Sequence, residues 1–144
     1  MIAPLWLVGS AGALQLALTR EQLCAMSDLV AVVELTGIEH RWATDGGIER
    51  QADLTVQRVV HGPEVDDLSL VLPGGTMGEL TLWIEDVPEL VEHQPYLVLL
   101  KRHDTLGWTF LGGDGGAIPL ALADGHAGEP LQAALASLGS CDAP

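Results

Sequence analysis

Two long runs of strand-forming residues, separated by an Asp-Gly turn, limit what this chain can fold into more than any other feature. The first run, residues 29–42, begins with five apolar side chains and then alternates between polar and apolar ones. The chain reverses at Thr44-Asp45-Gly46-Gly47, where glycine supplies the positive φ that a tight turn needs. It returns over residues 52–60 until His61-Gly62-Pro63 ends the run. The pattern predicts a long antiparallel β-hairpin.

Further segments also have the pattern of strands, each bounded by glycine, proline or charged residues. Residues 96–100 are apolar on both faces, which predicts a central strand. Residues 79–84 alternate, which predicts a strand whose outer face, including Trp83, is exposed or half buried. The other predicted strands cover residues 68–72, 107–111 and 118–122.

Two short helices are predicted, one before and one after the strands. Thr19 with Gln22 three residues later is a capping-box pattern, which predicts a helix that runs up to Ser27. Pro130 suits the first position of a second helix, and Gly139 suits its end. The apolar face of this second helix carries Leu131, Ala134, Leu135 and Leu138.

Together these elements predict one mainly β domain, a small antiparallel barrel or sandwich of five to six strands with a short helix at each end. The chain has 144 residues, 48% of them hydrophobic, which is enough to bury a single core. We expect this domain to cover residues 14–144, because the segment before it has a different character.

Residues 1–13 have features of a signal peptide. No charged side chain occurs before Arg20, residues 2–8 are apolar, and Ala11-Gly12-Ala13 fits the rule for signal-peptide cleavage. We expect cleavage after Ala13 and a secreted or periplasmic protein. Two alternatives stay open: residues 2–18 remain as a membrane anchor, although a span needs ~20 apolar residues, or they form a buried structural segment.

The negative charge of the protein disfavours two classes of partner. The sequence has 20 acidic residues against six Lys and Arg, for a formal charge of −14. Such a protein repels nucleic acid and anionic membrane surfaces. We expect a solvated acidic surface and, as the partner, another exported protein.

No group of residues has the spacing of a known metal or catalytic site. The five His residues form neither H-x-H nor H-E-x-x-H. His93, between Glu92 and Gln94, is the best candidate metal ligand, but a third ligand has to come from elsewhere in the fold. Gly9-Ser10-Ala11-Gly12 lacks the strand that precedes a nucleophile elbow. We therefore assign no catalytic residue, no metal ligand and no cofactor.

The most glycine-dense segment, Gly112 to Gly116, has three interpretations. A phosphate-binding loop needs a Lys and a following helix, and calcium-binding repeats need several copies. A sharp bend or bulge needs neither. We favour the bend.

The two cysteines, Cys24 and Cys141, flank the whole β region. An even number of cysteines in an exported chain favours pairing, whereas in a reducing cytoplasm both would stay as thiols. We predict a disulfide between the first helix and the segment just beyond the second.

Several short phrases are similar to those of small exported bacterial β-domains. They are Ser27-Asp28-Leu29-Val30, the stretch Val56 to Gly62, Pro73-Gly74-Gly75, the strand Tyr96 to Leu100, and the pair Gly107-Trp108. More widely, residues 21–120 resemble the OB-like barrels of the netrin and tissue-inhibitor-of-metalloproteinase type. The resemblance implies an OB-like fold and an exported setting.

The sequence departs from that resemblance in two places. Val33 and His93 stand where such domains more often have glycine. No Cys lies near the expected mature N-terminus, where the metalloproteinase inhibitors carry the Cys that approaches the metal of the enzyme. The inhibitory mechanism is therefore not transferred to this chain.

Two classes of function follow from these observations. The first, which we favour, is an exported non-catalytic binding or accessory module, because Trp42 and Trp83 lie at strand ends or on outer faces, where aromatic side chains anchor interfaces. The competing interpretation of both Trp residues is ordinary packing at the edge of a sheet. The second class is a hydrolase or metal-dependent enzyme whose residues converge only in three dimensions.

Overall fold

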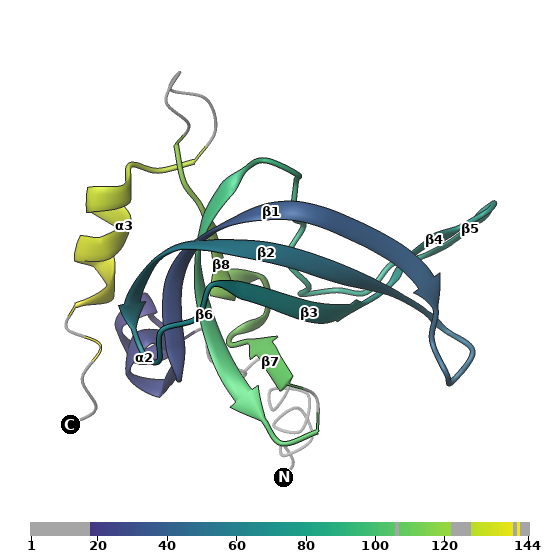
Figure 1. Ribbon diagram of the computed structural model, residues 1–144, viewed down its shortest axis with the longest axis horizontal. Coiled ribbons are helices and arrows are strands. Elements are labelled where there is room, and N and C mark those ends of the chain that lie inside the picture. The colour runs from purple at the N-terminus through teal and green to yellow at the C-terminus, as the bar shows by residue number, and fades with distance from the viewer. Residues whose placement is uncertain (1–17, 106, 122–127, 140, 142–144) are drawn as a thin grey trace, which may run out of the picture.

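The computed structural model describes residues 18–105, 107–121, 128–139 and 141. The expected signal segment, residues 1–13, lies outside the described residues. Figure 1 shows the described elements, which in chain order are α2 (Arg20–Met26), β1 (Leu29–Trp42), β2 (Ile48–His61), β3 (Asp67–Pro73), β4 (Gly75–Met77), β5 (Leu80–Leu82), β6 (Pro95–His103), β7 (Gly107–Phe110), the 3-10 helix η1 (Gly113–Gly116), β8 (Ala117–Pro119) and α3 (Leu131–Leu138).

The β1–β2 hairpin is the longest feature of the structure, as the sequence predicted. Its pairing runs from Val30 opposite His61 to Trp42 opposite Ile48, and the register shifts at three points. Such bulges bend a strand, and the hairpin curves across the whole molecule in Figure 1. β2 begins at Ile48, four residues before the predicted start at Ala52, because residues 48–51 still pair with β1.

Six strands form one antiparallel sheet in the order β3-β2-β1-β6-β7, with β8 also paired to β6. The edge strands β3 and β7 lie in contact. In the described part of the chain they share no ladder of hydrogen bonds, so the sheet curls without closing into a barrel. The prediction of a mainly β domain with a short helix near each end is confirmed.

The first part of β1 is buried on both faces, which explains its unbroken apolar run. Leu29, Ala31 and Val33 point into the concave core of the curled sheet. Val30 and Val32 point to the other face, where α2 and α3 cover the sheet. The helices α2 and α3 thus cover one half of the outer face of the sheet. The other half, toward Trp42, is not covered by them (Figure 1).

The predicted disulfide is present and ties the two helical ends together. Cys24 of α2 is bonded to Cys141, with the two Cα atoms 4.7 Å apart, and both residues are buried. Next to it, the Arg20 guanidinium forms a salt bridge with Glu129, with Nη1 and Oε1 2.6 Å apart, and donates a hydrogen bond to Ser137. The loop that the disulfide closes contains every strand of the sheet.

The glycine-rich segment makes a tight turn, in line with the predicted bend. Gly112 has φ of 78°, and a Cβ built there would lie 2.7 Å from a methyl carbon of Leu23. Glycine is therefore needed both for the backbone angle and for the close approach to α2. Among the described residues, no helix is both long enough and apolar enough to cross a membrane.

The strand predicted over residues 79–84 is present only in part and lies outside the six-stranded sheet. Only Leu80–Leu82 is a strand, β5, and it pairs with β4 in a separate two-stranded sheet. Leu80, Leu82 and Ile84 are all exposed. Trp83, expected to be exposed or half buried, is 68% exposed.

Candidate functional site

The two-stranded sheet of β4 and β5, which we call the arm, lies against the end of the β1–β2 hairpin far from the helices (Figure 1). The Gly74 N–H donates to the carbonyl oxygen of Ile48 at 2.7 Å, where the chain enters β4. Gly75 passes close to the side chains of His40, Arg50 and Ile48. The arm thus crosses the inner face of the hairpin and forms one wall of a pocket.

Arg50 lies at the base of this pocket. Buried and less buried residues alternate along β2, and Arg50 falls on the buried face between Ile48 and Ala52. It is 9% exposed. Its Nε donates to the carbonyl oxygen of Gly74 at 3.0 Å and its Nη2 to that of Pro73 at 3.1 Å. Hydrogen bonds to these two carbonyl oxygens replace part of the hydration that the guanidinium loses on burial.

The imidazole of His40 stands beside Arg50, because the two residues are opposite each other in the hairpin. Its Nδ1 accepts the backbone N–H of Thr76 at 2.9 Å, so Nε2 carries the hydrogen in the neutral ring. The hydroxyls of Thr76 and Thr81 are 3.1 Å apart across the arm. Hydrogen bonding therefore fixes both the arm and the orientation of the imidazole.

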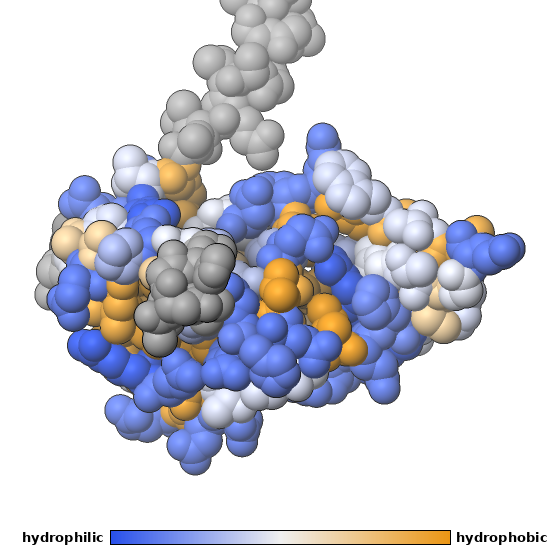
Figure 2. All heavy atoms as spheres, turned by 90° about the horizontal axis from the view of Figure 1, so that it is seen from above, coloured by the Kyte–Doolittle hydropathy of each residue, from blue (hydrophilic) through white to orange (hydrophobic). Residues whose placement is uncertain are grey.

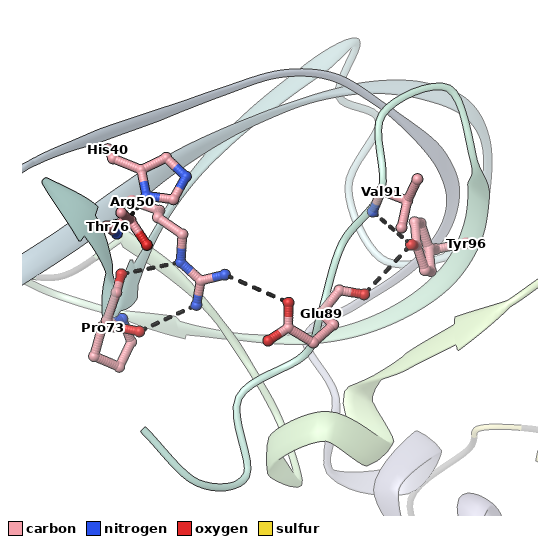
Figure 3. Close-up of polar contacts among 8 residues, drawn as sticks. His40, Arg50, Pro73, Thr76, Glu89, Val91 and Tyr96 are labelled. Carbon is pink, nitrogen blue, oxygen red and sulfur yellow. Dashed lines mark hydrogen bonds and ion pairs between the residues drawn. The ribbon is translucent and has the colours of Figure 1, made fainter. Parts of the chain in front are cut away.

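The pocket has a volume of about 150 Å³. Figure 3 shows Arg50, His40 and Glu89 converging from β2, β1 and the loop that precedes β6. The chemistry is mixed, because hydrogen-bond donors line one part and apolar side chains another. The lining residues are His40, Arg50, Gly75, Thr76, Thr81, Leu82, Trp83, Ile84 and Glu89.

The backbone of Glu89 is held by hydrogen bonds, whereas its side chain is largely exposed. The Tyr96 hydroxyl accepts the N–H of Val91 at 2.8 Å and donates to the Glu89 carbonyl oxygen at 3.4 Å (Figure 3). Burial raises the pKa of Tyr96, although the Val91 N–H opposes the shift. The Glu89 side chain is 79% exposed, and its Oε2 lies 4.0 Å from Arg50 Nη1. This is an ion pair without a hydrogen bond.

Large exposed hydrophobic side chains gather at the pocket end of the molecule, and three of them, Leu82, Trp83 and Ile84, line the pocket. Trp42 is on the same side of β1 as His40 by strand alternation, and it is 53% exposed. We call Trp42, Leu80, Leu82, Trp83 and Ile84 the hydrophobic rim. The rim holds five of the nine exposed large hydrophobic residues in the described part of the chain. Figure 2 shows pale and orange atoms at this end of a mostly hydrophilic surface.

The two interface candidates of the sequence, Trp42 and Trp83, therefore lie at the same end of the molecule. His93 does not join them: its side chain is exposed and its Nδ1 is 3.4 Å from Oε2 of Glu34. In the residues that the structure describes, no group of three or more His, Cys, Asp or Glu side chains is arranged to hold a metal ion.

Sequence reasoning missed Arg50, His40 and Glu89 as site residues. A signal for Arg50 was present, because it occupies an inward position of β2 between apolar Ile48 and Ala52, and the chain has only six Lys and Arg residues in all. A lone basic residue at an inward strand position must find polar partners inside the fold. Glu89 had no such signal, because it comes from a loop.

Comparison of the chain with protein-family models finds no match, and a search of curated proteins finds no relative.

Proposed function

We propose that this protein is an exported, non-catalytic binding module that contacts another exported protein through the hydrophobic rim. The observation that carries the proposal is the gathering of five exposed large hydrophobic side chains at one end of a protein with a formal charge of −14, where three of the five line a pocket. Isolated exposed hydrophobic residues are common on soluble proteins, whereas contiguous apolar patches mark interaction sites.

The composition of the rim suits a protein interface. Trp and Arg dominate the energetics of such interfaces, and they act best in pockets surrounded by residues that exclude water. Trp83 lies beside the pocket with Arg50 at its base, and Leu82 and Ile84 extend the apolar area. A partner that covers the rim removes two indole rings from water, which contributes several kcal/mol of hydrophobic free energy at roughly 25 cal/mol per Å².

Export is supported by the covalent bond between Cys24 and Cys141. Disulfides of this structural kind form and persist in oxidising compartments and are rare in the cytoplasm. The apolar residues 2–8 followed by Ala11-Gly12-Ala13 supply the expected targeting signal. We therefore propose a secreted or periplasmic location.

The proposed fold type is a partly open OB-like barrel. The order β3-β2-β1-β6-β7, with the two edges in contact, is the strand order of a five-stranded Greek-key barrel opened between β3 and β7. The β1–β2 hairpin then has the place of the first two barrel strands, and its far end is free to hold a binding site.

Comparative pull-down from an envelope extract tests the proposal. The wild type, Trp83→Glu and Trp42→Glu are used as baits, with Val71→Glu as the matched control, because Val71 is 45% exposed on the opposite face of the sheet. We expect one protein to be retained by the wild type and the control and lost with both Trp variants.

Two further results bear on the proposal. Combined substitution of Glu92, His93 and Asp114 should leave partner binding intact, because none of these residues belongs to the rim. Retention of the same partner by both Trp variants would contradict the proposal, and so would tightly bound stoichiometric metal that is lost with His93→Ala.

A further inference from the structure

We infer that the pocket binds one carboxylate, the side chain of an Asp or Glu residue of the protein partner, on the free edge of the Arg50 guanidinium. The inference rests on the proposed function and names the group that the partner presents. It depends on three features of the pocket: the incomplete hydrogen bonding of Arg50, the loose position of Glu89, and the donors and apolar side chains around them.

The guanidinium has one edge engaged and one edge free. Nε and Nη2 donate to the carbonyl oxygens of Gly74 and Pro73, which occupy the Nε–Nη2 edge of the planar group. Nη1 points toward Glu89 in Figure 3 and makes no hydrogen bond within the described residues. The outer edge formed by Nη1 and Nη2 presents parallel N–H groups, which match the two oxygens of a carboxylate.

Burial makes this free edge unusual. The Arg50 side chain is 11% exposed, and the nearest carboxylate oxygen, on Glu89, is 4.0 Å from it. Buried charges in proteins are normally paired and hydrogen-bonded, because an uncompensated charge loses its hydration. A carboxylate within hydrogen-bond distance therefore gains more here than it would at an exposed Arg.

Glu89 stands at the mouth of the pocket as a carboxylate that a ligand can displace. Its side chain is 79% exposed, so it can rotate into water at little cost. While it remains near Arg50 it competes with an incoming acid for the same cation. Removal of its charge should therefore strengthen the binding of an external carboxylate.

The rest of the pocket favours one acidic side chain in an apolar setting. The His40 ring offers its Nε2 hydrogen, and the Thr76 and Thr81 hydroxyls lie on the arm wall. A volume of about 150 Å³ is small for a ligand site, which commonly holds 300 Å³ or more, and suits a single side chain. Trp83 at the rim can pack on apolar residues that flank the acid. Because the whole protein is acidic, a partner with many acidic residues would be repelled.

The experiment uses capped amino acids as probes of the full mature protein. Two-dimensional NMR follows the Trp indole and Arg Nε resonances while N-acetylglutamate N-methylamide is added, and N-acetylglutamine N-methylamide serves as the neutral match. We expect the Glu probe to bind at least about fivefold more tightly than the Gln probe, with shifts at Trp83 and Arg50.

Glu89→Gln keeps the test independent of folding, because the residue is exposed. We expect this variant to bind the Glu probe about threefold more tightly than the wild type does. Glu79→Gln, which removes the same charge from the exposed turn of the arm, is the control and should change the affinity less. Arg50→Met should abolish the preference for the Glu probe.

Three results would overturn the inference. Equal affinity for the Glu and Gln probes would show that the pocket does not recognise a carboxylate. Weaker binding of the Glu probe by Glu89→Gln than by the wild type would show that Glu89 itself contacts the ligand, as it would contact a neutral sugar. Tighter binding of N-acetylglycine, which has a free chain-terminal carboxylate, would assign the pocket to a chain end. Probe binding with an unchanged pull-down of Trp83→Glu would contradict the proposed function while the pocket chemistry stands.

Discussion

The Arg50 guanidinium donates a hydrogen bond through Nε to the carbonyl oxygen of Gly74, 3.0 Å away. The bond joins the inner face of β2 to the point where the chain enters the arm. Arg50 thus has two roles in the structure, since one edge of its guanidinium holds the arm and the other faces the pocket. The position of the hydrophobic rim therefore depends on a buried cation as well as on apolar packing.

Arg50→Met should lower the free energy of unfolding by about 2 kcal/mol, because two hydrogen bonds from a charged donor are lost and two carbonyl oxygens lose their partner. Urea denaturation followed by far-ultraviolet circular dichroism measures the change. Arg58→Met, an exposed position on the same strand, is the control and should change stability by less than about 0.5 kcal/mol. Equal urea midpoints for the two variants would show that Arg50 does not hold the arm.

Gly75→Ala should loosen the arm. Gly75 has φ of 147°, and a Cβ there would lie 2.7 Å from Nδ1 of His40, the atom that accepts the Thr76 N–H. The arm has to move or the hydrogen bond has to break. Limited proteolysis should cut the arm faster in this variant. Gly78→Ala is the matched control, because Gly78 also has a positive φ but meets nothing within 4 Å. Equal cleavage rates would contradict the steric argument.

The sequence predicted those elements whose local pattern and burial agree. The β1–β2 hairpin has a turn signal between two strand patterns, and α2 has its capping box, in which the Thr19 hydroxyl accepts the Gln22 N–H. The helix α3 was predicted from its apolar spacing and from Gly139. In each case exposed turn or cap residues set the local conformation, and apolar residues of the same element face the core.

Prediction failed where burial depends on residues distant in the sequence. Residues 79–84 alternate like a strand of the main sheet, yet neither set of side chains is buried, because β5 pairs with β4 outside the main sheet. The pocket was also missed, since His40, Arg50 and Glu89 come from three segments that meet only after the sheet curls. Local periodicity in a sequence does not show which distant segments contact one another.

Loss of the disulfide should reduce stability strongly. The bond between Cys24 and Cys141 closes a loop with a sequence separation of 117, for which the chain-entropy model gives ~4 to 5 kcal/mol as an upper value. Intact mass after alkylation, with and without reductant, should differ by the label on two thiols, and reductant should lower the melting temperature. Two free thiols in protein isolated from the envelope would contradict the bond.

Export should leave a protein that begins at Leu14. The expectation follows from the apolar residues 2–8 and from Ala11-Gly12-Ala13, which fits the rule for signal-peptide cleavage. N-terminal sequencing of protein recovered from the envelope or the medium checks it. Ala13→Arg should block cleavage, whereas Ala17→Arg, beyond the expected cleavage site, should leave it unchanged. A cytoplasmic protein that starts at Met1 would remove the basis for both the location and the proposed partner.

Acid should weaken the contact between α2 and the segment before α3. Hydrogen bonds from Arg20 hold the pKa of the Glu129 carboxyl below its usual value, against the opposing effect of burial. A carboxyl whose pKa is lower in the folded than in the unfolded state stabilises the fold fully above its unfolded pKa, and that contribution disappears as the pH falls through the folded value. The urea midpoint of the wild type should therefore fall as the pH drops below about 4.5. Glu129→Gln is less stable at pH 7, and its urea midpoint should fall by less over the same window.

Glu64→Gln, in an exposed loop, is the control and should follow the wild type. Parallel curves for the wild type and Glu129→Gln between pH 7 and pH 3 would show that the ion pair with Arg20 does not contribute to the acid sensitivity of the fold.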